Sequence, residues 1–208
     1  MWATLPSSRS CTSVPTDSSS GTSGSGRWQS DGRPEHLRAA CESSLARLGT
    51  EQIPLYQLHR PDPAVPIEDS VGELVALRDE GKIRHIGLSN VDARQLEQAL
   101  ALTPIASVQN RYNPSDRSSE PLVELAETHG FAFIPWAPVG GHQPGEGEGL
   151  ATVAKHRGVL PVQVAIAWLL ARSPQMLPIP GTSSVAHLEE NVAAAALGLS
   201  EDELAALG

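Results

Sequence analysis

From residue 33 onward, short apolar runs alternate along the chain with longer segments whose apolar residues recur at helical spacing. The short runs predict strands at residues 53–58, 85–88, 105–108, 131–134 and 176–179. The longer segments predict helices at residues 34–48, 67–80, 92–102, 119–129, 150–156, 161–171 and 185–196, and a last helical turn capped by Ser200 with Glu203. Short apolar strands separated by helices are typical of parallel βαβ units with right-handed crossovers.

Five β/α units in series, without the strand reversal of dinucleotide-binding sheets, favour a barrel over an open sheet. A complete barrel of this kind usually needs about 250 residues and eight units. The chain has 208 residues, so we predict an α/β fold that forms a partial TIM (β/α)8 barrel of about five units over residues 33–208.

Residues 1–32 differ from the rest because 20 of them are Ser, Thr, Gly or Pro. A segment with so little apolar surface cannot offset the entropy that it loses on ordering. We therefore predict a disordered or atypical leader. An organellar transit segment and a shifted reading frame are the alternatives.

Charge and composition narrow the classes of partner. The formal net charge of −9 disfavours nucleic acid or an anionic membrane surface. The longest apolar run, residues 164–171, is far shorter than the roughly 20 residues that span a bilayer. Two cysteines cannot build a disulfide framework, and the seven histidines lack metal-ligand spacing. We therefore expect a cytoplasmic protein without a metal site.

Side chains suited to ligand contacts follow the predicted strands where each strand ends. These positions are His59, Ser89, Asn90, Gln109, Asn110, Trp136 and residues 181–184. One polar residue after a strand is ordinary turn chemistry, but in a barrel the carboxyl ends of all strands form one rim. Five such sets in phase predict a polar ring around a shared pocket.

Three separated segments carry a resemblance to a known family. They are residues 55–61 (LYQLHRP), residues 81–90 (GKIRHIGLSN), and residues 179–184 (IPGTSS) followed by Glu190 and Asn191. In order and spacing, over roughly residues 26–208, the chain resembles the aldo-keto reductase superfamily. The resemblance implies a TIM barrel that interconverts aldehydes or ketones and alcohols by hydride transfer with NADP(H).

The resemblance also implies roles for individual positions near the nicotinamide. His59 corresponds to the family's active-site histidine, which orients the substrate carbonyl and supports proton donation. Ser89, Asn90 and Gln109 match residues that hold the carboxamide, a group that needs the donors and acceptors of such side chains. Trp136 takes the place of the aromatic residue, commonly tyrosine, that stacks on the nicotinamide.

The remaining cofactor-binding positions are implied for the phosphates and the adenosine end. They are Gly140, Gly181, Thr182, Ser183, Ser184, His187, Glu190 and Asn191. The family often has lysine at the position of Gly181 and arginine at that of His187, and these cations bind the ribose 2′-phosphate. Because this chain lacks both, NADP(H) is the expected cofactor and NAD(H) the alternative.

The family's proton donor is a tyrosine, assisted by an aspartate and a lysine, and these positions should precede residue 33. Residues 1–32 contain no tyrosine and no lysine. We expect Tyr56 to face the outer helices and Tyr112 to anchor a loop, which leaves His59 for residual activity. The expected protein is thus a truncated oxidoreductase for a small carbonyl or alcohol substrate. A catalytically impaired nucleotide-binding module and a non-functional fragment are the alternatives.

A five-strand remnant of a barrel exposes two sheet edges, and exposed edges invite pairing with another chain. We therefore expect self-association through these edges.

Overall fold

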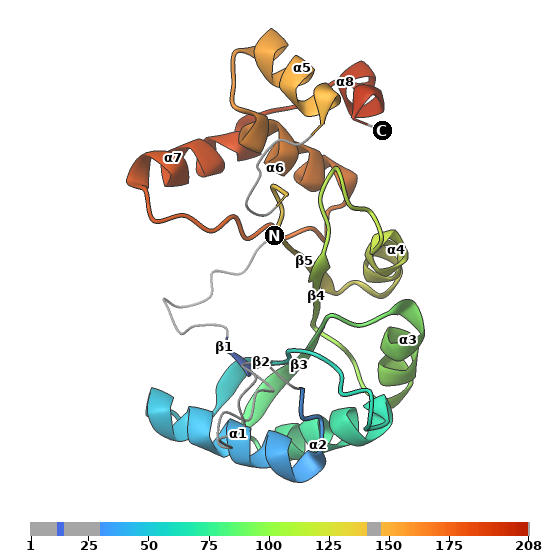
Figure 1. The fold of residues 1–208 in the computed structure, drawn as a ribbon. Coiled ribbons are helices and arrows are strands. Elements are labelled where there is room, and N and C mark those ends of the chain that lie inside the picture. Colours follow the sequence, from blue (N-terminus) through green and yellow to red (C-terminus); the bar gives the residue numbers. More distant parts are fainter. Residues whose placement is uncertain (1–11, 15–29, 141–146, 208) are drawn as a thin grey trace, which may run out of the picture. The chain divides into compact units, whose positions relative to one another are not determined.

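The computed structural model describes residues 12–14, 30–140 and 147–207 of the chain (Figure 1). These residues divide into two compact units, with the boundary between Ala106 and Ser107. Both units alternate parallel strands with helices, which confirms the predicted α/β class. The prediction of one barrel portion over residues 33–208 stays a prediction.

Unit 1 is a parallel three-stranded arrangement accompanied by three helices (Figure 1). Its elements are β1 (Thr12–Val14), α1 (Pro34–Leu48), β2 (Ile53–Leu58), α2 (Ile67–Asp79), β3 (Ile83–Ser89) and α3 (Ala93–Leu102). Strand β2 lies in the middle, where Tyr56 pairs with Thr12 on one side and with Ile86 on the other. Helix α2 packs against both α1 and α3.

Local signals account for the helices of unit 1. Helix α1 has a proline in its first turn and ends at Gly49, whose φ of +61° is a conformation that suits glycine. Helix α3 begins with a capping box, because Asp92 accepts from the Gln95 N–H and the Gln95 side chain accepts from the Asp92 N–H. The predicted helix bounds agree with the structure to within a residue or two.

Unit 2 combines one parallel strand pair with five helices and a short 3₁₀ turn in its described part. Its elements are β4 (Ser107–Arg111), α4 (Glu120–His129), β5 (Ala132–Trp136), α5 (Glu148–Arg157), α6 (Pro161–Arg172), α7 (Val185–Ala193), η1 (Ala194–Ala196) and α8 (Glu201–Ala206). The capping box of Ser200 and Glu203 at the start of α8 is present, as predicted.

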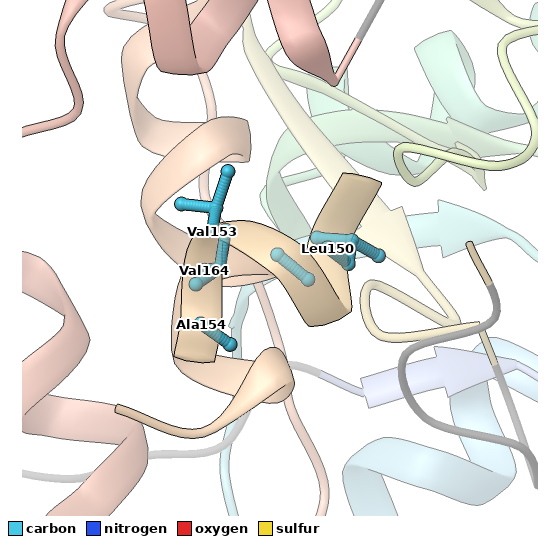
Figure 2. Close-up of a cluster of buried hydrophobic side chains, with 5 residues drawn as sticks. Leu150, Val153, Ala154 and Val164 are labelled. Atoms are coloured by element: carbon cyan, nitrogen blue, oxygen red, sulfur yellow. The ribbon is translucent and has the colours of Figure 1, made fainter. Parts of the chain in front are cut away.

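A buried aliphatic cluster joins α5 to α6 in unit 2 (Figure 2). Leu150, Val153 and Ala154 of α5 meet Val164 and Ala165 of α6. Partly buried aliphatic side chains from the C-terminal segment pack against this cluster. The cluster accounts for the start of the apolar run of α6, of which residues 164–169 are buried.

The predicted strand at residues 176–179 is wrong. This segment forms a single parallel bridge between Met176 and Phe133, in which the Leu177 N–H donates to the Phe133 carbonyl at 2.8 Å. The physical reason is that Pro178 and Pro180 have no N–H and cannot extend a ladder.

The predicted disorder of residues 1–32 does not hold for the parts of this segment that the structure describes. Thr12–Val14 forms β1 and pairs with β2. Gly32 is fixed at both ends, because its N–H donates to Asp62 at 3.1 Å and its carbonyl accepts from the Ser70 hydroxyl at 2.6 Å. Composition does not predict this order, because the hydrogen-bond partners of β1 and Gly32 are distant in the sequence. Residues 1–11 and 15–29 lie outside the described residues.

Candidate functional site

The structure brings three of the predicted site residues together in unit 1. The Asn90 side-chain amide donates to the His59 backbone carbonyl at 2.9 Å and to the Ser89 hydroxyl at 3.0 Å. Ser89 is buried, whereas His59 and Asn90 are half-buried and reach the surface. This hydrogen bond is accepted by the His59 backbone. It therefore fixes the point where the chain leaves β2, but it does not fix the imidazole.

Strand register explains this arrangement. Leu58 pairs with Leu88, so the residues that follow β2 and β3 leave the sheet side by side at the same edge. Asn90 then adopts a φ of +57°, in the left-handed region that Asn enters more easily than most residues. This turn directs its short amide back to His59.

Tyr56 lies on the other face of β2, as the sequence predicts. Its side chain is fully buried beside Cys41 and Ser44 of α1. Burial raises the pKa of Tyr56 well above its usual range. Tyr56 therefore belongs to the core between β2 and α1 and reaches no substrate.

In unit 2, two predicted site residues share one face of the β4–β5 pair. Gln109 pairs with Ile134 and Arg111 pairs with Trp136. Because side chains alternate along a strand, Gln109, Arg111 and Trp136 project to the same face. Gln109 and Trp136 are both half-buried.

The Arg111 guanidinium lies over the Trp136 ring, 5.5 Å from its centroid. Asp116 holds this guanidinium through a 2.9 Å ion pair. Sequence interpretation missed both residues. The sequence did not indicate Arg111, because the predicted strand ended at residue 108, whereas β4 continues to Arg111.

The chain turns sharply after Trp136. Ala137 has a φ of +50° and its carbonyl accepts from the Gly140 N–H at 3.1 Å. The same carbonyl accepts from the Asn113 side-chain amide at 3.0 Å. Gly140 itself has a φ of +84°, which favours glycine at this position. The structure thus places Gly140 in a turn four residues after Trp136.

Tyr112 is a loop anchor, as predicted. Its hydroxyl donates to Glu120, and its ring stacks on Trp168 with centroids 5.6 Å apart. Phe133 meets the same ring edge-on at 5.7 Å. Burial, with the Glu120 contact as a second cause, raises the pKa of Tyr112. This tyrosine is therefore committed to packing in unit 2.

The segment 181–184 directly precedes α7 and is mostly exposed. Gly181, Thr182 and Ser183 are exposed. The Ser184 hydroxyl caps the helix by accepting from the His187 N–H at 3.4 Å, and the Thr182 hydroxyl accepts from the Ser184 N–H at 3.1 Å. The hydroxyls of Thr182 and Ser184, which were predicted to contact phosphate, thus already accept hydrogen bonds from nearby backbone N–H groups.

His187, Glu190 and Asn191 all lie in α7, where their spacing places them on one side of the helix. His187 is exposed and the other two are half-buried. The Glu190 backbone carbonyl accepts from the Gln163 side chain at 3.0 Å, which ties this part of α7 to α6.

The described residues contain neither a membrane-spanning helix nor a cluster of metal ligands. None of the helices there is long and apolar enough to cross a membrane. In the same part of the chain, no group of three or more His, Cys, Asp or Glu residues is placed to hold a metal ion.

Comparison with known proteins defines the class to which this fold and these positions belong. The aldo/keto reductase family model matches residues 14–144 and 146–208. Because this match covers most of the chain, the chain belongs to the aldo/keto reductase family. The match begins at residue 14, within residues 1–32, for which the composition predicts a disordered or atypical leader.

Two curated relatives show the degree of similarity. An uncharacterized oxidoreductase of Schizosaccharomyces pombe is 45% identical over 185 residues, which cover 88% of this chain and 60% of that protein. Pyridoxine 4-dehydrogenase of Escherichia coli is 40% identical over 187 residues, which cover 86% of this chain and 65% of that enzyme. The chain therefore spans less than two thirds of the length of these relatives.

Solved structures agree with this assignment. A thermostable aldo-keto reductase, crystallised with the inhibitor epalrestat, matches with a TM-score of 0.78 and 34% identity over 84% of this chain and 66% of that one. An aldo/keto reductase from Klebsiella pneumoniae, in complex with NADP and acetate, matches with a TM-score of 0.71 and 31% identity over 83% of this chain and 63% of that one.

Proposed function

We propose that this chain binds a nicotinamide nucleotide and works in an oxidoreductase that interconverts aldehydes or ketones and alcohols by hydride transfer. NADP(H) is the proposed cofactor and NAD(H) the alternative. The observation that carries the proposal is the junction of His59, Ser89 and Asn90 at the ends of β2 and β3, in a member of the aldo/keto reductase family.

The donor set in each unit fits the chemistry of this cofactor. A carboxamide needs both donors and acceptors, which Ser89, Asn90 and Gln109 supply. The half-buried Trp136 offers an aromatic surface for the nicotinamide ring. The N-terminal end of α7 suits a phosphate, because its first N–H groups and the helix dipole favour an anion. When bound, the cofactor supplies the hydride.

Further residues complete this proposal. Gly140, in the turn after β5, lets the backbone approach the cofactor closely. His187, Glu190 and Asn191 bind the adenosine end from one side of α7. Since Gly181 and His187 stand where the family often has lysine and arginine, we expect only a small preference for NADP(H) over NAD(H).

His59 is the proposed proton donor to the substrate oxygen. Neither Tyr56 nor Tyr112 can take this role, since both are buried and burial raises the pKa of each. General acid catalysis contributes about 10²–10⁴-fold to a rate. A chain that relies on a histidine in place of the family's tyrosine, aspartate and lysine should therefore turn over slowly. A nucleotide-binding module with impaired catalysis is the second candidate function.

Tryptophan fluorescence during NADPH titration tests nucleotide binding by the full chain. We expect quenching that saturates, and a Trp136→Phe variant should lose most of that change while Trp168 still reports folding. No quenching at millimolar NADPH would overturn the proposal. The decrease in NADPH absorbance with a reactive aldehyde then separates the two candidates. Slow turnover that disappears in His59→Ala supports the oxidoreductase, and binding without turnover supports the impaired module.

We also propose that residues 33–208 form part of a TIM barrel. In such a partial barrel, two sheet edges would be open to self-association. The bridge at Met176 supports this view, because it continues the parallel direction beside β5.

A further inference from the structure

Gly32 lies at the junction of α1, α2 and the loop that begins with His59. Its N–H donates to the carboxylate of Asp62, the third residue after His59, at 3.1 Å. Its carbonyl accepts from the hydroxyl of Ser70, in α2, at 2.6 Å. Helix α1 begins two residues later, at Pro34. The segment that precedes α1 therefore holds the loop that follows β2.

The loop after His59 is fixed at two points. At its start, the His59 carbonyl accepts from the Asn90 side chain at 2.9 Å. At its other end, the Asp62 Oδ2 accepts from the Gly32 N–H, while the Oδ1 accepts from the Ala64 N–H at 2.9 Å. Only two residues separate these points, and one of them is a proline with a fixed φ. The position of Asp62 therefore limits where the backbone of His59 can lie.

The space at position 32 accommodates only glycine. Gly32 is buried, and a Cβ there would lie 2.9 Å from the Asp62 Cβ and 2.9 Å from the Ser70 Oγ. Cβ atoms in proteins do not approach other atoms so closely, so a neighbour would have to move. The Ser70 hydroxyl can rotate away, but the Asp62 Cβ is bonded directly to the backbone. An added side chain therefore acts on the backbone of the loop.

The segment around Gly32 forms a tight turn that leads directly into α1. The Asp31 carboxylate accepts from the Arg33 side chain at 2.6 and 2.9 Å and from the Arg33 N–H at 3.2 Å. The hydrogen bond from the Arg33 side chain is the main cause that lowers the pKa of Asp31 to about 2. The Arg33 carbonyl then accepts from the Leu37 N–H at 3.0 Å, in the first turn of α1. Because this turn is joined to α1, we expect the loop after His59 to be the part that yields.

We propose that Gly32, acting through Asp62, is a positioning residue that sets where His59 meets the substrate oxygen. The inference rests on the proposed function, because it requires His59 to be the proton donor. Proton transfer needs a hydrogen bond of about 2.6–3.2 Å between the heavy atoms. A misplacement of about 1 Å can lower a rate about 100-fold. A smaller displacement of the loop should therefore lower kcat and leave the proposed cofactor contacts in place.

Steady-state oxidation of NADPH with a reactive aldehyde, catalysed by the full chain, tests the inference. Gly32→Ala should lower kcat by about three- to tenfold and leave the KM for NADPH nearly unchanged. Gly149→Ala is the matched control, since its Cβ would lie 2.6 Å from the Ala206 carbonyl oxygen within unit 2. It should lower stability and leave kcat unchanged. Gly72→Ala adds a side chain in open space on α2 and should behave like the unmodified chain.

A second measurement follows His59 itself and does not require turnover. In the full chain with isotope-labelled histidine, the imidazole NMR signals of His59 are those that disappear in His59→Gln. Gly32→Ala should shift these signals, and Gly149→Ala should leave them in place. Asp62→Ala removes the acceptor of the Gly32 N–H and should shift them as well. Because Gly32 and Asp62 act through one contact, their effects on kcat should not be additive in the double variant.

The outcomes separate this inference from the proposed function. If the unmodified chain does not oxidise NADPH with a reactive aldehyde, the proposed oxidoreductase function fails and the inference fails with it. If it does, and Gly32→Ala retains the kcat of Gly149→Ala or leaves the His59 signals in place, only the inference is overturned. A lower kcat at unchanged KM, together with shifted His59 signals, supports it, since a general loss of stability would affect Gly149→Ala in the same way.

Discussion

Asn90 determines the local geometry where β2 and β3 end. Its left-handed backbone turns the chain, and its amide joins Ser89 to the His59 backbone at 3.0 and 2.9 Å. One residue thus supplies both the turn and the tie between two strands. This double role explains why Asn suits the position, since its side chain bonds locally and its backbone tolerates a positive φ.

Replacing Asn90 separates these two contributions. Asn90→Ala removes both hydrogen bonds and places a Cβ at a φ of +57°, so we expect a loss of about 1–2 kcal/mol in the free energy of unfolding. Asn90→Gly relieves the backbone strain and should recover part of that stability. Both variants should weaken NADPH binding equally, because both lack the amide. Denaturation curves and NADPH titration measure the two effects, and equal stability of the two variants would contradict the role of the backbone.

At the scale of elements, an ion pair joins α5 to α8. Arg157 binds Glu203 through two 2.5 Å contacts, and Glu203 also accepts from the Ser200 N–H at 2.8 Å as part of the capping box. The Arg157 hydrogen bond is the main cause that lowers the pKa of Glu203 to about 2. The carboxylate therefore both caps α8 and holds it to α5.

This pair should make part of the stability of unit 2 dependent on pH. The folded-state pKa of Glu203 lies below its unfolded value, so its contribution is complete above about pH 4.5 and is lost as the pH falls toward 2. Arg157→Gln should therefore be less stable than the unmodified chain at pH 7, and the difference should shrink below about pH 4.5. Urea denaturation across this range, followed by tryptophan fluorescence, measures it. Glu203→Gln should lose the ion pair but keep an acceptor for the cap. A difference that grows as the pH falls would contradict the assigned sign.

The helices and strands also differ in how well the sequence predicts them. Helix ends were predictable because their signals are local, as in the capping box of Asp92 and Gln95. Strand β1 was not, because its order comes from pairing with β2, some 40 residues away. The segment after Met176 failed for the opposite reason, since its apolar pattern suggested a strand that its prolines prevent.

The candidate site was predictable to a similar extent. The position of Asn90 beside His59 follows from the rule that parallel strands end at a common edge. The contact between Arg111 and Trp136 required the register of β4 with β5, which the sequence does not specify. The ion pair of Asp116 with Arg111 could not be predicted from the sequence, because it depends on the path of a loop.

For the whole molecule, the proposed self-association can be examined at its exposed aliphatic side chains. Strand β1 pairs with β2 in the described residues, and the segment after Met176 presents exposed aliphatic side chains, with Leu177 55% and Ile179 44% exposed. Exposed aliphatic side chains that lie close together favour association between chains. The net charge of −9 opposes association only over long range, and salt screens it.

Size-exclusion chromatography over a range of concentrations tests this expectation. We expect the unmodified chain to elute as oligomers whose fraction rises with concentration and with salt. Ile179→Lys introduces a charge among these exposed aliphatic side chains and should shift the population toward monomer. Leu102→Lys changes a similarly exposed aliphatic residue, at 50%, on α3 of unit 1 and should leave the distribution unchanged. A monomer at all concentrations would contradict the proposed self-association. An equal response of both variants would assign the association to general surface hydrophobicity and not to the segment after Met176.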